Sequence, residues 1–280
     1  MDRIIITLVA IVIGSINMAS QSGCCSPTAT QEFAALGSAA DFRSAHIEPA
    51  LSMSDEQFGE RIEIDVPGGA ATVARVFKAE GSPTATILVI HEWWGLNTFV
   101  VQQAAKLYED LGKKADVIAV DLYDGLVATT REAAAKAMQS VDEHRARAIL
   151  SAVISSVRTE HIGSVGWCFG GGWSLQASLM AGEKATACVM YYGMPEQDVD
   201  TLKKLSAPVL GIFASKDQWI TPQIVDTFQA NMMSAERMLS VKMYNADHAF
   251  ANPSNAHHDS DATRDAWENT IEFFTLHLMR

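Results

Sequence analysis

The chain has 280 residues, of which 48% are hydrophobic and 19% charged, a composition that suits one globular α/β domain and excludes a mainly disordered protein. Its 33 Asp and Glu against 21 Lys and Arg give a net charge of −12, which repels phosphate backbones, so we expect no nucleic-acid partner. Four cysteines in a chain of this length exclude a small scaffold held together by disulfides.

The first residues are typical of a secretory signal. Arg3 precedes the apolar run 4–13, and small and polar residues follow as far as Cys24. The run is shorter than the roughly 20 residues that a transmembrane helix needs. We therefore expect residues 1–23 to be a signal segment and the protein to be exported, to the periplasm. Two kinds of processing stay open: peptidase cleavage near residues 19–23, or lipidation of Cys24 and anchoring to a membrane.

Residues 24–55 are rich in Ala, Ser, Thr and Gln with little periodicity, which predicts a tether or a loosely packed extension. The globular domain is then expected to span residues 56–280. In it, short β-branched runs alternate with helical stretches, the pattern of a mostly parallel sheet with helices on both faces. The predicted strands are 72–78, 86–91, 116–121, 162–167, 187–192, 208–214 and 239–244, and the predicted helices are 99–114, 131–158, 172–181, 223–233 and 262–278.

A glycine-rich turn follows the fourth predicted strand. Residues 166–172 have the sequence Gly-Trp-Cys-Phe-Gly-Gly-Gly, which matches the G-x-nucleophile-x-G elbow with Cys168 at the nucleophile position. Glycines flank such a nucleophile because the sharp bend leaves no room for neighbouring Cβ atoms. The following helix directs its N-terminus at the sulfur and favours the thiolate. A small buried cysteine in a turn is the alternative, whereas a dinucleotide loop fails on glycine spacing.

Two later strand ends carry the partners that a nucleophile needs. Asp217 follows the sixth predicted strand and His248 follows the last, so the chain order is nucleophile, acid, histidine, as in α/β-hydrolases. His248 would move the proton and Asp217 would fix its tautomer. Taken singly, Asp217 also suits a turn and His248 a loop. Asp247 is the rival acid, but an adjacent residue reaches the far side of the imidazole ring poorly.

The second predicted strand runs into His-Glu-Trp-Trp-Gly-Leu-Asn at residues 91–97, where α/β-hydrolases place an oxyanion-hole amide. This segment, Asp-Leu-Tyr at 121–123, Gly-Trp-Cys-Phe-Gly-Gly at 166–171, the Asp217 strand end and Asp-His-Ala-Phe at 247–250 together resemble the dienelactone hydrolase family. The similarity extends over roughly residues 60–278, and it implies the α/β-hydrolase fold.

The resemblance implies a role for each matching residue. Cys168 would be the nucleophile, His248 the general base and acid, and Asp217 the triad carboxylate. Glu92 would be the family's additional acid, which pairs with the resting thiol and accepts its proton when substrate displaces it. The backbone N–H groups of Trp93 and Phe169 would form the oxyanion hole.

The chain departs from the family at the positions that hold a substrate carboxylate. Dienelactone hydrolases carry one arginine after the Asp-Leu-Tyr segment and one after the histidine motif. Here the second position is Asn252, and the first arginine after Tyr123 is Arg131. Tyr123, Asn252 and Trp94 are further candidates for contact with substrate. Trp93 and Trp94 suggest a bulkier, more apolar mouth, although both residues also suit core packing.

We therefore expect a hydrolase that cleaves a small-molecule carboxylic ester or enol-lactone through a cysteine nucleophile and a thioester, with a natural substrate that need not be a dienelactone. A thioesterase or peptidase on the same fold is the rival enzyme. The alternative from another class is an exported, non-catalytic ligand-binding protein on an α/β-hydrolase frame. No metal or organic cofactor is implied, and His257-His258-Asp259 is expected to be a solvated loop.

Overall fold

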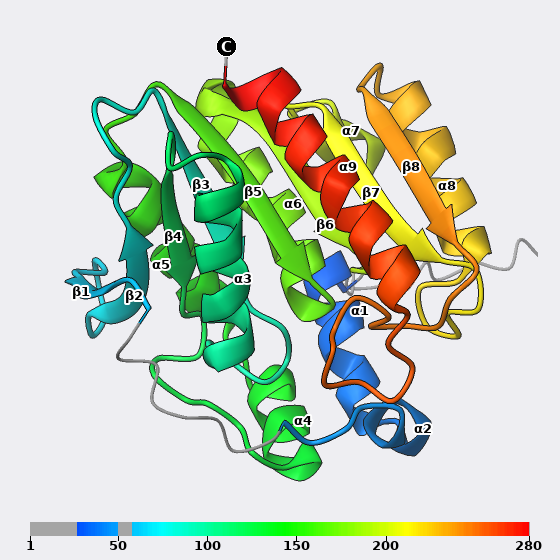
Figure 1. Ribbon diagram of the computed structural model, residues 1–280. Coiled ribbons are helices and arrows are strands. Elements are labelled where there is room, and N and C mark those ends of the chain that lie inside the picture. The colour runs from blue at the N-terminus through cyan, green and yellow to red at the C-terminus, as the bar shows by residue number, and fades with distance from the viewer. Residues whose placement is uncertain (1–26, 50–57, 280) are drawn as a thin grey trace, which may run out of the picture.

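The computed structural model describes residues 27–49 and 58–279 (Figure 1). The expected signal segment and Cys24 lie outside these ranges. The strands form one sheet in the order β1-β2-β4-β3-β5-β6-β7-β8. Their bounds are β1 Glu60–Ile64, β2 Thr72–Phe77, β3 Ala85–Ile90, β4 Asp116–Val120, β5 His161–Trp167, β6 Ala185–Tyr191, β7 Val209–Ala214 and β8 Leu239–Tyr244.

The sheet is mostly parallel. β1 and β2 pair antiparallel, as do β2 and β4, and the pairs from β4 through β8 are all parallel. Strands β3, β5, β6 and β7 are almost wholly apolar and buried, as expected for parallel strands covered on both faces. The α/β-hydrolase fold is thereby confirmed. β1 was not predicted, because it is a polar, mostly exposed edge strand without an apolar run.

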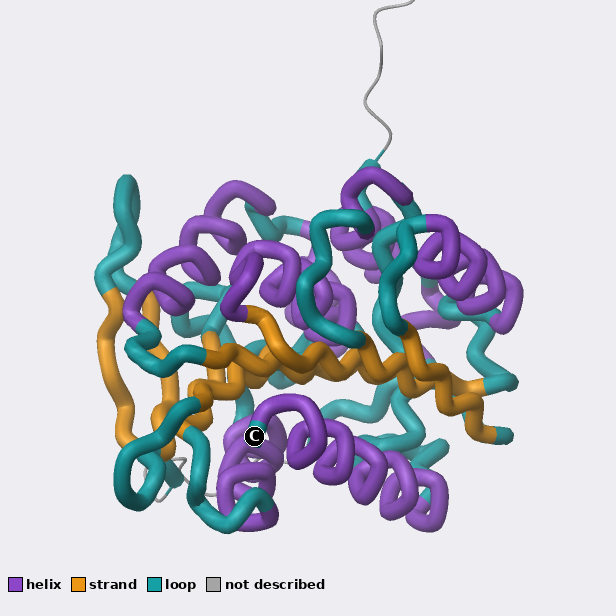
Figure 2. Tube along the Cα trace, turned by 90° about the horizontal axis from the view of Figure 1, so that it is seen from above, coloured by secondary structure: helices purple, strands orange, loops and turns teal. Residues whose placement is uncertain are grey.

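Helices cover both faces of the sheet, as the edge-on view in Figure 2 shows. In Figure 1, α3 (Thr98–Asp110) and α9 (Ser260–Leu278) lie in front of the sheet, while α5 (Glu143–Ser156), α6 (Phe169–Ala181) and α8 (Pro222–Ser234) lie behind it. The remaining described helices are α1 (Ala29–Ala35), η1 (Leu36–Ser38), α2 (Ala40–Ser44), α4 (Arg131–Gln139), η3 (Gly182–Lys184) and α7 (Val199–Leu202).

Two sequence predictions were wrong about helices. The predicted helix 131–158 is two helices, because Asp142 starts a new one by accepting a hydrogen bond from the His144 backbone N–H at 2.9 Å. The expected loose extension is also folded where it is described. Within residues 29–44 lie α1, η1 and α2, which pack below the sheet in Figure 1 with Phe33 and Phe42 buried.

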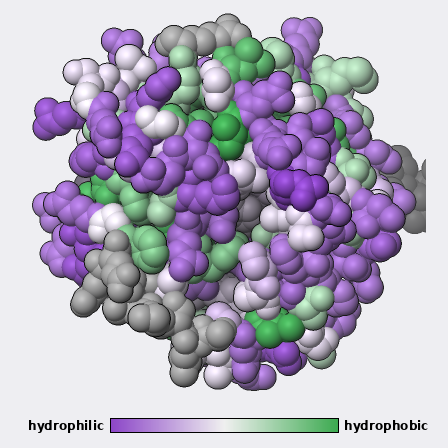
Figure 3. Space-filling model, viewed as in Figure 1, coloured by the Kyte–Doolittle hydropathy of each residue, from purple (hydrophilic) through white to green (hydrophobic). Residues whose placement is uncertain are grey.

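The described helices include none that is long and apolar enough to cross a membrane. The face of the molecule shown in Figure 3 is mainly hydrophilic, with hydrophobic side chains scattered across it. Most large apolar side chains of the described residues are buried in the core, although Met233 and Met238 are exposed.

Candidate active site

Strand register brings the predicted site residues to one edge of the sheet. Ile90 of β3 pairs with Gly166 of β5, so Glu92 and Cys168, each two residues further along, leave neighbouring strands at the same level. Ala214 of β7 pairs with Tyr244 of β8, just before the turns that carry Asp217 and His248. All of these strands are parallel, so their carboxyl ends meet at a single edge, where ligands bind in such folds.

The turn at Cys168 is a strained elbow. Cys168 has φ 56° and ψ −119°, a backbone conformation that a residue with a side chain rarely adopts. A Cβ atom at Gly166 would lie 2.1 Å from the Gly170 carbonyl oxygen, and one at Gly170 would lie 2.4 Å from the carbonyl oxygens of Ile90 and His91. Only glycine fits at both places, which explains the spacing around the cysteine.

The three predicted triad residues are in contact. Cys168 Sγ lies 3.4 Å from His248 Nε2, and His248 Nδ1 donates to Asp217 Oδ2 at 2.6 Å. Asp217 also accepts hydrogen bonds from the backbone N–H groups of Trp219 and Ile220, both at 2.9 Å. Burial raises the pKa of Asp217, but His248 and these donors outweigh burial and hold that pKa below its ordinary value.

Burial and the Asp217 carboxylate together set the charge states of Cys168 and His248. Burial lowers the pKa of His248, but the Asp217 carboxylate and the Cys168 sulfur outweigh it and raise that pKa, which makes His248 a strong base for the thiol proton. Burial raises the pKa of the Cys168 thiol and Glu92 adds to this, against the opposing influence of His248 and of the Phe169 N–H. With a side chain that is 1% exposed, the sulfur is therefore a thiol at rest.

The backbone N–H groups of Trp93 and Phe169 are the predicted oxyanion-hole donors. In the described part of the chain, neither the Trp93 nor the Phe169 N–H donates to a backbone carbonyl. The Phe169 N–H interacts with the Cys168 sulfur and lowers its pKa. Phe169 is the first residue of α6 and Trp93 follows the end of β3, so both amides come from elements fixed by the sheet.

Comparison with known proteins identifies the family of the chain. The family model described as "Dienelactone hydrolase family" matches residues 72–278. The chain belongs to the dienelactone hydrolase family. It is 27% identical over 205 residues to "Protein usf" of Aquifex pyrophilus, covering 69% of this chain and 88% of that protein. A putative carboxymethylenebutenolidase of Saccharolobus solfataricus is 24% identical over 251 residues, covering 75% and 96% respectively.

Solved structures of this family share the fold. A putative dienelactone hydrolase from Klebsiella pneumoniae aligns with a TM-score of 0.67 at 21% identity, covering 78% of this chain and 99% of that one. A dienelactone hydrolase from Anabaena variabilis aligns with a TM-score of 0.58 at 15% identity, covering 78% and 97% respectively. At such identities the likeness establishes the architecture alone.

Glu92 is a buried acid with one engaged oxygen. Its side chain is 2% exposed, Oε2 accepts a hydrogen bond from Asn252 Nδ2 at 2.8 Å, and Oε1 has no partner among the described residues. Burial raises the pKa of Glu92 to about 7, although Asn252 and His248 lower it. Asn252 is itself held by Ser254, whose N–H and hydroxyl donate to its Oδ1. Asn252 thus holds Glu92 from the position where this family carries an arginine.

The other predicted contact residues, Tyr123, Trp93 and Trp94, are all buried. Tyr123 is buried 5.4 Å from the Phe169 ring, its hydroxyl lacks a partner in the described structure, and the charge of Cys168 acts on it. Trp93 and Trp94 are both buried, with ring centroids 4.7 Å apart. Trp93 contacts the N-terminal segment, whereas the described aromatic contacts of Trp94 are with Trp93 alone.

The N-terminal segment, residues 28–46, covers the catalytic residues. Phe42 is 0% exposed, with ring centroids 5.4 Å from Trp93, 5.2 Å from Trp219 and 6.0 Å from His248. His46 lies 5.5 Å from the His248 ring. Burial, then the charge of His248, lowers the pKa of His46 to about 3, which keeps its imidazole neutral. The sulfur is shielded from solvent beneath these side chains.

Polar contacts hold the segment in place. Arg131 donates from Nε to the His46 carbonyl oxygen at 2.6 Å, and its backbone N–H donates to Glu48 Oε1 at 3.1 Å. Thr28 donates to Glu143 Oε2 at 2.8 Å. Arg131, the first arginine after Tyr123, is therefore engaged with the N-terminal segment.

Sequence reasoning missed the residues that this segment and its neighbours bring to the site: Phe33, Phe42, His46, Tyr192 and Trp219. One local signal was available. Thr28 and Gln31 form a capping box, in which each side chain satisfies the other residue's backbone N–H. That motif marks the start of a helix inside the expected tether.

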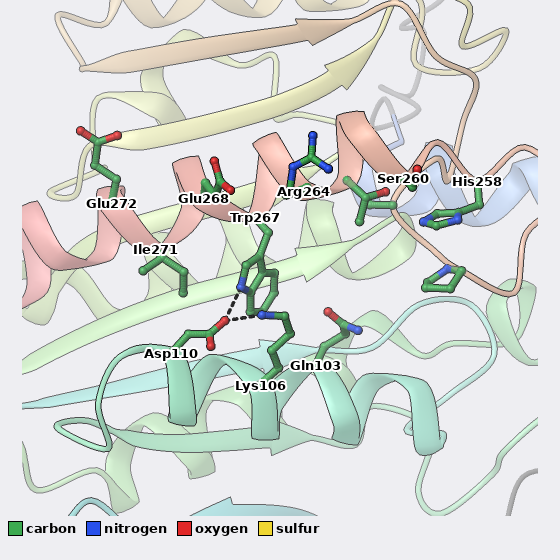
Figure 4. A pocket seen from close by; sticks show the side chains of 13 residues that line it. Gln103, Lys106, Asp110, His258, Ser260, Arg264, Trp267, Glu268, Ile271 and Glu272 are labelled. Carbon is green, nitrogen blue, oxygen red and sulfur yellow. Dashed lines mark hydrogen bonds and ion pairs between the residues drawn. The ribbon is translucent and has the colours of Figure 1, made fainter.

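An open groove of about 880 Å³ lies elsewhere, between α3 and α9 (Figure 4). Asp110 accepts hydrogen bonds there from Lys106 and, at 2.7 Å, from Trp267 Nε1. The residues that line this groove include no member of the predicted triad.

Proposed function

We propose that this protein hydrolyses a small-molecule carboxylic ester or enol-lactone by nucleophilic catalysis at Cys168. One observation carries the proposal: a cysteine at a strained strand-to-helix elbow lies 3.4 Å from an imidazole whose other nitrogen is bound to a buried carboxylate at 2.6 Å. Nucleophile, base and orienting acid in this contact are the arrangement that acyl transfer needs. Family membership supports a hydrolase.

The reaction proceeds in two halves. Cys168 Sγ attacks the carbonyl carbon while His248 takes the thiol proton, and the tetrahedral oxyanion receives hydrogen bonds from the Trp93 and Phe169 N–H groups. Collapse breaks the bond to the alkoxy or enol oxygen, which leaves with the proton from His248. A water molecule, deprotonated by His248, then attacks the thioester, and the acid is released as the thiol is restored. Asp217 stabilises the imidazolium in both halves.

Glu92 supplies a second place for the thiol proton. Because burial raises its pKa to about 7, this carboxyl exchanges a proton near neutral pH, and its Oε1 has no other described partner. Substrate entry that brings Glu92 within reach of the thiol would let it accept that proton and generate the thiolate only when the site is occupied.

The side chains around His248 favour a neutral, apolar acyl group. Besides its hydrogen-bond partners Asp217 and Cys168, His248 has five aromatic rings of the described residues close to its own: Phe33, Phe42, His46, Tyr192 and Trp219. Arg131 is engaged by the His46 carbonyl, and Asn252 is engaged by Glu92. A substrate carboxylate therefore lacks the two arginines that anchor it in dienelactone hydrolases, so we infer a neutral ester as the preferred class.

The test compares the purified protein with Cys168→Ala on p-nitrophenyl acetate and on a dienelactone. We expect the wild type to hydrolyse the neutral ester faster, with a burst of p-nitrophenol and a thioester adduct detected by mass spectrometry, and the variant to lose both. Cys188→Ala is the matched control, because Cys188 is buried within β6. A folded wild type that hydrolyses neither compound would refute the enzyme and favour the ligand-binding alternative.

We also propose that the protein is exported, from the basic and apolar order of residues 1–23. Fractionation of the source cells and the mass of the mature N-terminus test this proposal. A free N-terminus near residues 19–23 indicates peptidase cleavage, a diacylglyceryl Cys24 indicates a lipoprotein, and an intact Met1 in the cytoplasm contradicts export.

A further inference from the structure

Three potential metal ligands from distant parts of the chain meet above the elbow. Cys168 Sγ, His248 and His46 each offer one ligand atom, and these atoms all lie within 4.8 Å of one another. We propose that these three residues bind a thiophilic divalent cation, of which Zn²⁺ is the representative. This proposal goes beyond the hydrolase function and does not depend on it, because binding requires only the ligand set.

Hydrogen bonds already fix both imidazoles in the orientation that a metal requires. His248 Nδ1 donates to Asp217 Oδ2 at 2.6 Å, and His46 Nδ1 donates to the Phe42 carbonyl oxygen at 2.7 Å. His46 therefore presents Nε2 as a free lone pair, and His248 presents Nε2 toward Cys168 Sγ, its hydrogen-bond partner at 3.4 Å. Metal-ligating histidines in proteins almost always donate their other ring N–H to a carboxylate or a backbone carbonyl in this way.

The free nitrogen of His46 needs a partner. Nε2 of this ring is buried, and no described residue forms a hydrogen bond with it. The ring is wedged between Phe42, at a centroid distance of 4.5 Å, and Trp93, at 4.6 Å. A buried polar atom without a partner costs about 1–3 kcal/mol, so a ligand that bonds to Nε2 would relieve this cost.

The spacing is close to that of tetrahedral zinc. Zn–S bonds of about 2.3 Å and Zn–N bonds of about 2.0–2.1 Å place tetrahedral ligand atoms about 3.3–3.6 Å apart. Cys168 Sγ and His248 Nε2 already lie at 3.4 Å. An inward shift of His46 by about 1 Å completes the set, given the 4.8 Å limit on all three separations. One coordination position remains for water.

The types of ligand atom determine which cations bind and what their binding does to the site. One thiolate and two imidazoles suit Zn²⁺ and its late first-row neighbours, whereas Mg²⁺ and Ca²⁺ prefer oxygen ligands. Binding displaces the thiol proton, and any proton on His248 Nε2, to solvent. The bound cation occupies the sulfur that the proposed hydrolysis uses. It also ties the N-terminal segment to the elbow through His46, so the cation-bound protein is the closed and inactive form.

The test is calorimetric titration of the purified, metal-stripped protein with Zn²⁺, together with Co²⁺ absorption spectroscopy. We expect one Zn²⁺ per chain, a sulfur-to-cobalt charge-transfer band, and no binding of Mg²⁺. His46→Phe keeps an aromatic ring between Phe42 and Trp93. We expect this variant to bind Zn²⁺ at least about 100-fold more weakly than the wild type. Removal of a residue that only hydrogen-bonds to a metal ligand typically weakens binding about 10-fold to 100-fold. Cys168→Ser should abolish the cobalt band.

His257→Gln combined with His258→Gln is the matched control, because neither histidine belongs to the group formed by His46, Cys168 and His248, and the change should leave Zn²⁺ affinity unchanged. Equal affinity in His46→Phe and wild type, or a wild type without the cobalt band, overturns the proposal. The cobalt band decides the question even if His46→Phe fails to fold. Tight Zn²⁺ binding by a protein without esterase activity would support this site and reject the hydrolase, and an active esterase indifferent to Zn²⁺ would do the reverse.

Discussion

Replacing Glu92 with glutamine should stabilise the folded protein, and only above a defined pH. Burial raises the pKa of Glu92 from its ordinary value of 4.5 to about 7. The folded state therefore holds this proton more tightly than the unfolded state does. Between about pH 4.5 and pH 7 the unfolded chain releases this proton while the folded chain still holds it, so stability falls as pH rises through this window and the cost is fully present above it.

The size of the effect follows from the shift. The difference between 4.5 and about 7 corresponds to about 3 kcal/mol, because one pKa unit is worth about 1.4 kcal/mol. Glutamine has the same shape, carries no charge and can accept the hydrogen bond that Asn252 Nδ2 donates to Glu92 at 2.8 Å. We expect Glu92→Gln and wild type to unfold alike at about pH 4, and the variant to be more stable by up to about 3 kcal/mol at pH 8.

Urea unfolding at a series of pH values measures this difference. Glu160→Gln is the control. Glu160 is exposed and lies just before the amino end of β5, whereas the candidate site lies at the carboxyl ends of the strands, so the control variant should unfold like the wild type. A stability difference between Glu92→Gln and wild type that stays constant with pH would show that Glu92 is not a buried acid with a raised pKa. The reasoning about the resting thiol would then fail with it.

Two further results are expected. Phe42→Ala removes a fully buried ring at a cost of about 3–5 kcal/mol, which should loosen the N-terminal segment. Alkylation of Cys168 by iodoacetamide should then be about 100-fold faster or more, while Cys188 still reacts slowly. Equal alkylation rates of Cys168 in the variant and the wild type would mean that the segment does not limit access. Asn252→Leu removes the hydrogen bond that lowers the pKa of Glu92, so the pH-dependent fall in stability should extend about one pH unit higher. If the fall ended at the same pH in the variant and the wild type, Asn252 would not lower the pKa of Glu92.

The strand ends and the elbow could be predicted because their signals are local. The glycine spacing around Cys168, the order of Asp217 and His248, and apolar runs bounded by turns are all contained in short stretches of sequence. Register then brings these residues together without further information, since parallel strands align their carboxyl ends.

The cover of the site could not be predicted because its signal is not local. Phe42 and His46 lie among alanines and serines, and nothing nearby in the chain indicates that they pack on Trp93 and His248. Helices as short as α1 and α2 gain most of their stability from such tertiary packing. Composition alone therefore describes this stretch as a tether.

The position of the N-terminal segment sets an order for folding. The segment leaves the ribosome first, yet the surface on which it packs includes Trp219 and His248, which are made near the end of the chain. Joining residues so far apart in sequence costs loop-closure entropy, which favours their docking after the sheet is complete. Until β8 has joined the sheet, neither His248 nor the N-terminal segment can cover Cys168, so its thiol is more accessible to oxidants during folding than in the folded protein.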